Sequence, residues 1–318
     1  SVSGGTLSVG HASALGSGTL SMTGGKVSSD STTARALTNG LSLGGTVTLG
    51  DTVNTGALTF SGAGSVTGAS SVTVSSATTL NGALDLQGNT VTVSPASGVT
   101  LSMGGVVSGV GGRIVKGGAG TLTLSGVNTF SGGVTVGSGT VLAGHDQAFG
   151  TGAVGISGGA IVSSNSTSAR SFANDFSLNG SVTLGDVTNN GALTFGGAGT
   201  LTANATLTAP SVVTLGGAIG GGAFSLTKAG TSILALSGAN TFSGGVVVTG
   251  GTLRIGNDAG LGSGLLTLNT ASVVVSSDSV TARTLSNGFT IGANVTIGDA
   301  TNSGALTFGG TGAVTANS

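Results

Sequence analysis

Apolar and polar residues alternate along most of this chain, in runs of only a few residues. Thr46–Leu49 reads T-V-T-L and Thr121–Leu124 reads T-L-T-L, and such runs are bounded by Gly, Asn, Asp or Ser. This is the pattern of short strands that bury one face. No long stretch places apolar residues at helical spacing, and each Gly inside a helix would cost about 1 kcal/mol. The pattern predicts an all-β fold.

One block of sequence occurs twice. Lys116–Val136 reads KGGAGTLTLSGVNTFSGGVTV, and Lys228–Val248 reads KAGTSILALSGANTFSGGVVV. The copies share a first Lys, a strand-like run and the string S-G-x-N-T-F-S-G-G-V. Self-similarity at long period is typical of repeat architectures, in which similar units stack on one another.

A longer module surrounds this block. Three segments begin at Arg35, Arg170 and Arg283, and each ends in the string G-A-L-T-F. The sequence numbers of the arginines differ by 135 and then by 113 (170 − 35, 283 − 170). We therefore expect one continuous domain, residues 1–318, with modules at about residues 1–137, 138–249 and 250–318. Residues 1–7 match the end of a repeated block at residues 247–253, so we expect the chain to be a window from a longer array.

A finer period runs inside each module, because small polar corner residues recur at nearly constant intervals. The numbers of His11, Asp30 and Asp51 differ by 19 and then by 21, and the other two modules repeat this spacing closely. Coils of roughly 20–23 residues with short strands are typical of a parallel β-helix, and the chain has room for roughly 15 of them. Three apolar pairs that share one spacing are predicted to stack in adjacent coils. These pairs are Leu41/Phe60, Phe176/Phe195 and Phe289/Phe308.

The first module is longer than the second between two matching landmarks. The numbers of Phe60 and Lys116 differ by 56, whereas those of Phe195 and Lys228 differ by 33 (116 − 60, 228 − 195). The surplus of 23 (56 − 33) matches the length of one coil. We therefore predict that residues 61–115 contain one coil more than residues 196–227.

Composition narrows the class of function. The net charge is −1 and only 5% of residues are charged, which argues against nucleic acid as a partner. No apolar run approaches the ~18 residues of a membrane-spanning helix, and no signal peptide is visible. The chain has no Cys, so disulfides and thiolate metal sites are excluded.

The carboxylates offer one candidate for chemistry. Asp258, Asp278 and Asp299 have the spacing of one coil edge, as do Asp30 and Asp51, and stacked carboxylates are able to hold a cation. The second module carries Asn165 at the equivalent place, which removes the charge but keeps a turn-forming side chain. Side chains of Asp and Asn that cap turns explain both residues. We therefore favour turns over a metal site.

Charged pairs recur with the same spacing in each module. They are Arg35 with Asp51, Arg170 with Asp186, and Arg283 with Asp299. Equivalent pairs are five or six coils apart, or ~25 Å, so they are too far apart for one active site. They fit either a sparse row of charges that repeats along the molecule and binds a repetitive partner, or charges that are solvated or paired locally.

Two further patterns resemble functional sites. His145-Asp146 lies in a serine-rich chain, but no serine stands in a recognisable nucleophile elbow. Thr-x-Thr pairs of the kind that form ice-binding ladders begin at Thr46, Thr90, Thr121 and Thr206, with no constant coil period. The sequence therefore predicts no catalytic residue, no cofactor and no metal ligand.

At the repeated block the chain resembles a known family. Lys116–Gly144 and Lys228–Gly256 resemble the passenger-associated transport repeat of bacterial autotransporters, with Gly, Asn, Thr-Phe and Gly-Gly at fixed offsets. The resemblance implies a right-handed parallel β-helix that is secreted and displayed on a bacterial surface. It also implies anchoring at the outer membrane through a region outside this segment.

These observations favour a structural or adhesive extracellular protein that is not an enzyme. The alternative is a carbohydrate-active β-helix enzyme of the lyase or hydrolase class, which the regular coil spacing does not favour. The expected partners are other copies of the same chain, a surface glycan or a cell-surface receptor. No nucleic acid and no membrane-spanning segment are expected in this region.

Overall fold

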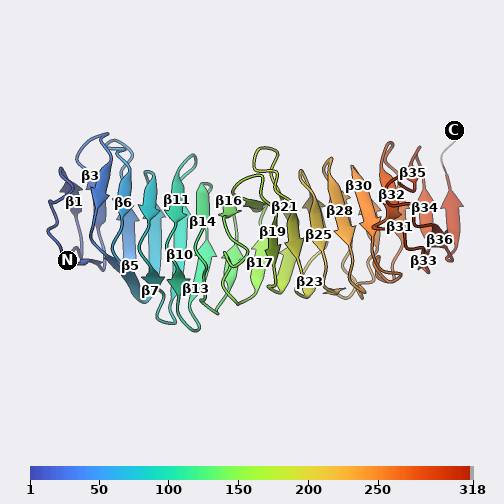
Figure 1. Ribbon diagram of the computed structural model, residues 1–318, viewed down its shortest axis with the longest axis horizontal. Helices are drawn as coiled ribbons and strands as arrows, with labels where there is room; N and C mark the ends of the chain where they lie inside the picture. Colours follow the sequence, from blue (N-terminus) through green and yellow to red (C-terminus); the bar gives the residue numbers. More distant parts are fainter. Residues whose placement is uncertain (316–318) are drawn as a thin grey trace. The chain divides into compact units, whose positions relative to one another are not determined.

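The computed structural model describes residues 1–315, and within them every regular element is a β-strand (Figure 1). The all-β prediction is confirmed. Contacts between residues divide the chain into two compact units, Ser1–Val154 and Gly155–Ser318, which are described in turn. No helix in residues 1–315 is long and apolar enough to cross a membrane.

Unit 1 is built from short strands that follow one another around successive turns. Its strands are β1 (Thr6–Val9), β2 (Leu20–Met22), β3 (Lys26–Ser29), β4 (Arg35–Leu37), β5 (Leu41–Leu49), β6 (Leu58–Phe60), β7 (Gly64–Val74), β8 (Thr78–Leu80), β9 (Leu84–Asp85), β10 (Thr90–Pro95), β11 (Thr100–Met103), β12 (Val107–Ser108), β13 (Arg113–Lys116), β14 (Thr121–Leu124), β15 (Val134–Val136) and β16 (Thr140–Ala143).

Each strand of unit 1 pairs in parallel with strands of the neighbouring turns. One column of paired residues runs Val47, Val72, Val93, Lys116 and Val136, and each step of this column is one turn of the chain. Parallel pairing between consecutive turns is the defining geometry of a parallel β-solenoid. The predicted fold class is confirmed. The step from Val47 to Val72 is the longest of the four, so the turns vary more in length than the sequence period predicts.

Unit 2 continues with the same kind of element. Its strands are β17 (Val154–Ser157, which begins on the last residue of unit 1), β18 (Ile161–Ser164), β19 (Arg170–Phe172), β20 (Phe176–Asn179), β21 (Ser181–Leu184), β22 (Leu193–Phe195), β23 (Gly199–Leu201), β24 (Ala205–Thr208), β25 (Val213–Leu215), β26 (Ile219–Gly220), β27 (Leu226–Ala229), β28 (Ile233–Leu236), β29 (Val246–Val248), β30 (Thr252–Ile255), β31 (Leu266–Leu268), β32 (Val274–Ser277), β33 (Arg283–Leu285), β34 (Phe289–Ile291), β35 (Thr296–Ile297), β36 (Leu306–Phe308) and β37 (Gly312–Val314).

The interior of each unit is filled by the apolar members of the alternating runs. In β14, for example, Leu122 and Leu124 are fully buried, whereas Thr121 and Thr123 are only half-buried. Successive residues of a strand point to opposite faces, so the alternation read from the sequence becomes an inside and an outside. Stacked Val, Leu and Phe side chains therefore form the core of each turn.

The predicted stacking of the phenylalanines is wrong in its register. Phe195 pairs directly with Phe172, and in the same way Phe60 pairs with Leu37 and Phe308 with Leu285. Phe176, the predicted partner of Phe195, lies on the strand that follows Phe172 in the same turn. It still contacts Phe195, with ring centroids 5.4 Å apart. The predicted spacing marks a diagonal contact across the interior, because a full turn here is longer and extends from Phe172 to Phe195.

The third of these pairs is less enclosed than the others. Phe289 and Phe308 contact each other with ring centroids 5.1 Å apart, but both side chains are only half-buried. By contrast, Leu41, Phe60, Phe176 and Phe195 are at most 3% exposed. Full burial is therefore confirmed for two of the three predicted pairs.

The extra coil in the first module is confirmed by the strand register. The column from Val47 reaches Lys116 in three steps, through Val72 and Val93. The equivalent column from Val182 reaches Lys228 in two steps, through Leu207. The additional segment of the first module therefore forms one complete turn and not a projecting loop.

Equivalent strands of different modules do not occupy the same sheet in unit 2. β18 pairs within the sheet that contains β21, β24 and β27, whereas its counterpart β32 pairs within the sheet of β28, β30 and β35. The module is therefore not a whole number of turns long. Arg170 on β19 and Arg283 on β33 consequently belong to different sheets, which does not favour the first alternative, a repeating row of charges along one sheet of this unit.

Candidate functional site

Each copy of the repeated block contains a fully buried lysine. Lys116, the last residue of β13, is 0% exposed. Its ammonium Nζ donates hydrogen bonds to the backbone carbonyls of Gly117 (2.6 Å), Gly118 (2.9 Å) and Ser138 (3.1 Å). Three carbonyls from two successive turns thus satisfy all three donors of the ammonium.

Lys228 on β27 repeats this arrangement in unit 2. Its Nζ donates to the carbonyls of Ala229 (2.8 Å), Gly230 (2.9 Å) and Gly250 (2.9 Å), and the side chain is again 0% exposed. Burial disfavours the charged form and lowers the pKa of both Lys116 and Lys228 to about 8. The Lys that begins each block is therefore buried and links two successive turns through hydrogen bonds. It is not a surface charge.

The Asn of the S-G-x-N-T-F string also links turns through hydrogen bonds inside the solenoid. Asn128 accepts a hydrogen bond from the backbone N–H of Val107 (2.8 Å) and donates one to the carbonyl of Ala148 (2.7 Å). Asn240 does the same with Ile219 (2.8 Å) and Gly260 (2.6 Å). Each Asn thereby links the preceding turn to the following one. This explains why an amide, with both a donor and an acceptor, stands at a buried position.

A glycine-rich loop follows each of the two repeated blocks, and a third loop of the same kind lies near the start of the chain. The loops are residues 10–18, 144–152 and 256–264. The second residue of each loop caps the turn: Nδ1 of His11 and His145, and Oδ1 of Asn257, accept a hydrogen bond from the backbone N–H two residues later. The predicted corner at these positions is confirmed.

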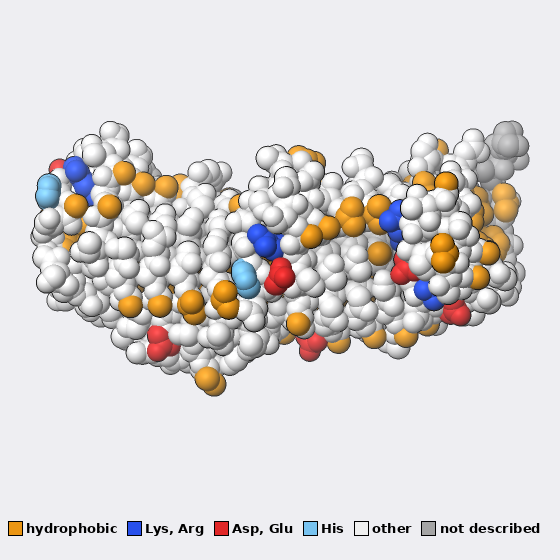
Figure 2. Space-filling model, viewed as in Figure 1, with side chains coloured by type: hydrophobic (Ala, Val, Ile, Leu, Met, Phe, Trp, Pro, Cys, Tyr) orange, Lys and Arg blue, Asp and Glu red, His pale blue; other side chains and the backbone are white. Residues whose placement is uncertain are grey.

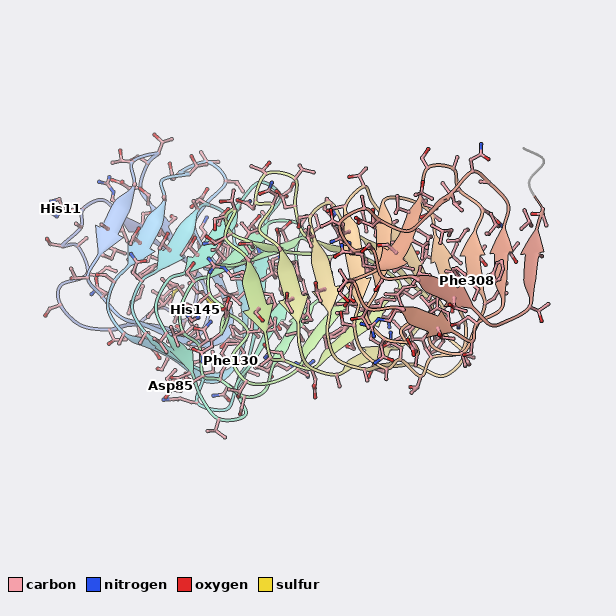
Figure 3. The ribbon with its side chains drawn as sticks, turned by 45° about the vertical axis from the view of Figure 1, so that its right-hand side comes forward. His11, Asp85, Phe130, His145 and Phe308 are labelled. Atoms are coloured by element: carbon pink, nitrogen blue, oxygen red, sulfur yellow. The ribbon has the colours of Figure 1, made fainter. Side chains whose placement is uncertain are left out.

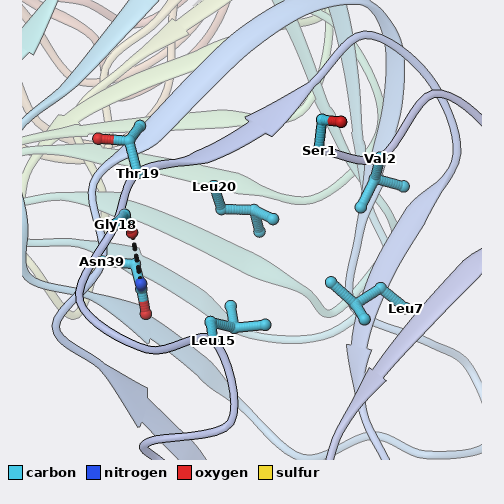
Figure 4. A pocket seen from close by; sticks show the side chains of 8 residues that line it. All are labelled: Ser1, Val2, Leu7, Leu15, Gly18, Thr19, Leu20 and Asn39. Atoms are coloured by element: carbon cyan, nitrogen blue, oxygen red, sulfur yellow. Dashed lines mark hydrogen bonds between the residues drawn. The ribbon is translucent and has the colours of Figure 1, made fainter.

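Buried asparagines of the following turn hold two of these loops in place through hydrogen bonds. In unit 1, Asn39 donates to the carbonyls of Gly16 and Gly18, beside a pocket of about 290 Å³ that Leu15 and Leu20 help to line (Figure 4). In unit 2, Asn287 donates to the carbonyls of Gly262 (3.0 Å) and Gly264 (2.7 Å). These side chains fix the path of the loops.

Of the residues predicted to cap turns, Asp51 and Asp299 do so, whereas Asp30, Asp278 and Asn165 accept hydrogen bonds from arginines instead. Oδ1 of Asp51 accepts hydrogen bonds from the backbone N–H groups two and three residues later. Asp186 and Asp299 make the same pair of contacts. Each aspartate starts a projecting loop, which accounts for the greater length of the turns that carry Asp51 and Asp186.

The charged groups pair locally and not at the spacing that recurs in the sequence. Arg35 pairs with Asp30 (2.5 Å), and Asp51 pairs with Lys26. In the third module Arg283 pairs with Asp278 (3.3 Å), and Arg254 pairs with Asp299 (2.9 Å). In the second module Arg170 donates to Asn165 (3.3 Å), so the amide replaces the carboxylate as the hydrogen-bond acceptor.

These ion pairs shift the titration of their carboxyl groups. The hydrogen bond from Lys26 and those from the capped backbone lower the pKa of Asp51 to about 2. Arg254, with the same kind of backbone contacts, lowers the pKa of Asp299 to about 2. The Arg35 guanidinium also lowers the pKa of Asp30.

The candidate cation site is not formed. Asp278 and Asp299 are paired with different arginines, and Asp258 accepts a hydrogen bond from the backbone N–H of Thr284 (3.2 Å). Within residues 1–315, no group of three or more His or carboxylate side chains lies close enough to hold a metal ion. Charged side chains on the face in Figure 2 form separate small spots and no continuous patch.

The other two patterns have different outcomes in the structure. His145 uses Nδ1 to cap Gln147 (3.1 Å) in its own loop, where Figure 3 labels it. The Thr-x-Thr pairs of unit 1, in contrast, are in better register than their sequence spacing suggests. Thr46 and Thr92 are both partners of Ser71 on β7, so hydroxyl side chains occupy three successive turns.

The buried lysines are the residues whose role the sequence left unassigned. The signal was present, since Lys116 and Lys228 both open the repeated block in a chain with very few charges. The alternation was a second signal that was not used, because each lysine stands two residues after an apolar inward residue, Ile114 or Leu226. A charged residue at an inward position therefore indicates a buried side chain that links turns through hydrogen bonds.

Comparison with known proteins supports the resemblance of the two blocks. The model of the passenger-associated-transport-repeat matches residues 114–143 and 226–255. A stretch of 42 residues is 60% identical to the protein named Adhesin BmaC autotransporter, of Brucella suis biovar 1 (strain 1330). That stretch is 13% of this chain and 1% of the Brucella protein. No solved structure matches the chain. The two passenger-associated transport repeats predicted from the sequence are confirmed.

Proposed function

We propose that this chain is part of an autotransporter passenger that is displayed outside a bacterial cell and acts there in adhesion. The observation that carries the proposal is the pair of passenger-associated transport repeats, each of which extends over successive turns of an all-strand parallel solenoid. The short similarity to an autotransporter adhesin points the same way. A stack of turns without elaborate insertions presents a long surface, which suits binding better than catalysis.

Surface display is tested in the organism that carries the complete gene. An epitope inserted at Val110, which is 90% exposed in a tight turn, marks unit 1 without touching its core. The expected result is antibody labelling of intact cells that disappears after external protease treatment. Labelling that requires permeabilised cells would contradict the display of this region.

Adhesion is tested by removing the region. A gene that lacks residues 1–318 is compared with the intact gene at equal surface amounts of the remaining passenger. We expect fewer cells to attach to a host-cell layer or to one another. Unchanged attachment would contradict an adhesive role for this part of the chain.

We further propose that copies of the chain associate side by side. The chain carries only 5% charged residues, and the outward positions of its strands are mostly Thr and Ser, so electrostatic repulsion between copies is weak. Light scattering of the purified chain over a range of concentrations tests this. Association should increase with concentration, whereas a monodisperse monomer at the highest concentration would contradict it.

A further inference from the structure

An open depression in unit 2, with hydroxyl side chains and one carboxylate in its lining, has the features of a binding site. Its volume is about 520 Å³, and it lies where the glycine-rich loop 256–264 meets β33 and the turn before the loop. Thr241, Asp258, Ser263, Thr284 and Ser286 contribute exposed side chains to it. We propose that this depression binds a sugar unit of a neutral polysaccharide.

The polar groups of the depression are of the kind that recognises sugar hydroxyls. Oδ1 of Asp258 accepts a hydrogen bond from the backbone N–H of Thr284 (3.2 Å), and Oδ2 has no hydrogen-bond partner within residues 1–315. A carboxylate oxygen is a strong acceptor for hydroxyl donors, and the hydroxyls of Thr241, Ser263 and Ser286 both donate and accept. Together they match a ligand that is dense in hydroxyl groups.

The charge of the depression selects among such ligands. Its lining contains one carboxylate and no Lys, Arg or His. An acidic sugar would therefore meet a like charge without a compensating cation, so an uncharged sugar is favoured.

The wall of the depression is held rigid from inside the solenoid. Asn240 donates to the carbonyl of Gly260 (2.6 Å), and Asn287 donates to those of Gly262 (3.0 Å) and Gly264 (2.7 Å). Asn257 caps the first turn of the loop at the N–H of Ala259 (2.9 Å). A site whose supporting residues are already fixed loses little conformational freedom on binding.

The depression has no aromatic ring on which a sugar would stack, so binding depends on hydrogen bonds. We therefore expect weak binding of a single sugar unit by this site.

The inference rests on the proposed adhesive function and names its partner class. It is tested by saturation-transfer NMR on the full chain with four probes: maltotetraose, cellotetraose, mannotetraose and chitotetraose. We expect binding of at least one probe, and a loss of affinity of about tenfold in Asp258→Asn, because a charged hydrogen-bond acceptor is removed. Absence of binding by all four probes would overturn the proposal.

A matched variant controls for the loss of charge. Asp85 is an exposed aspartate that caps a turn of unit 1 through the N–H of Gln87, and Figure 3 labels it at the outer rim of that unit. Asp85→Asn should leave the affinity for the bound probe unchanged. Equal affinity of wild type and Asp258→Asn would overturn the inference, as would a preference for the acidic tetrasaccharide of hyaluronan. Thermal unfolding of both variants checks that they fold.

Failure of this inference is distinguishable from failure of the proposed function. In cells, Asp258→Asn that attaches as well as wild type, with equal surface display, contradicts the sugar site alone. Loss of attachment on deletion of residues 1–318 still supports adhesion in that case. If the deletion has no effect, the adhesive function itself is contradicted.

Discussion

Phe172 and Phe195 occupy the same position on successive turns of unit 2, with ring centroids 5.1 Å apart. Phe176 contacts the same Phe195 ring from the neighbouring strand, at 5.4 Å. One side chain thus joins two turns and two sheets. Tilted ring contacts of this kind add to the stabilisation that comes from burial alone.

Replacing Phe195 should be among the most destabilising changes in unit 2. Phe195 is 0% exposed, so Phe195→Ala removes a large buried side chain and leaves a cavity, at an expected cost of about 3–5 kcal/mol. Chemical denaturation followed by circular dichroism measures the change. Phe224→Ala is the control, since Phe224 is 38% exposed and should cost about 1 kcal/mol or less. Equal effects would contradict the central position of Phe195.

Much of this fold was predictable from local sequence, and the exceptions have physical reasons. The alternation around Leu122 and the extra turn before Lys116 followed directly from spacing, because a solenoid converts sequence distance into turns. The partner of Phe195 did not, because Phe172 and Phe176 are equally plausible when the lengths of corners are unknown. A loop that projects from a corner changes the length of a turn without changing its strands.

The candidate sites were less predictable than the fold. Asp51 was correctly interpreted as a turn cap, because a cap depends only on neighbours in sequence. Its ion pair with Lys26 was not foreseen, since that contact depends on which strands become neighbours in β3 and β5. The depression around Asp258 likewise combines three turns, so it became visible only in the folded chain.

The buried lysines predict a rise in stability at alkaline pH. The pKa of Lys116 and Lys228 is about 8 in the fold, against 10.5 for an ordinary lysine, so the unfolded chain holds these protons more tightly. Stability should therefore increase as the pH rises from about 8 to 10.5. Urea denaturation across this range measures it.

The double variant Lys116→Met, Lys228→Met is the reference for that experiment. It keeps the length and the apolar part of both side chains but does not titrate there. The difference in stability between wild type and variant should shift in favour of wild type across the same pH range. A shift in the opposite direction would mean that the three carbonyls favour the ammonium more strongly than burial disfavours it.

Acid should weaken the corners that Asp51 and Asp299 hold. Both carboxyls have a pKa of about 2 in the fold, below the ordinary 3.8, so their stabilisation is complete above pH 3.8 and is lost as the pH falls towards 2. The double variant Asp51→Asn, Asp299→Asn retains an oxygen for the turn cap but removes the ion pairs. Its urea midpoint should change less than that of wild type across this acid range. Identical acid profiles would rule out these two ion pairs as a source of acid sensitivity.

Gly262 should not tolerate even a methyl group. Its φ is +65°, in the left-handed region, and a Cβ built there would lie 2.1 Å from the carbonyl oxygen of Phe242. Gly222 has a similar φ of +57° but open space around it, so Gly222→Ala isolates the backbone strain of about 1–2 kcal/mol. Gly262→Ala should be clearly more destabilising in thermal or urea unfolding. Similar losses in the two variants would show that the loop relaxes to admit the methyl group.

Removing one complete turn from unit 1 should leave the remaining stack intact. Val93 pairs with Val72 one turn earlier and with Lys116 one turn later, so deletion of residues 93–115 places Lys116 directly on Val72. Lys228 stacks on Leu207 in just this way in unit 2. The shortened protein should therefore keep its β-sheet circular dichroism and unfold cooperatively.

The control for this experiment is deletion of residues 104–115, which removes about half a turn. That change removes β12 and nearly all of β13, so the shortened turn lacks the strands that pair with β9, β10 and β15. We expect this variant to lose cooperative unfolding or to become sensitive to protease within unit 1. If the two deletions behave alike, the whole turn is not the unit in which this chain gains or loses length.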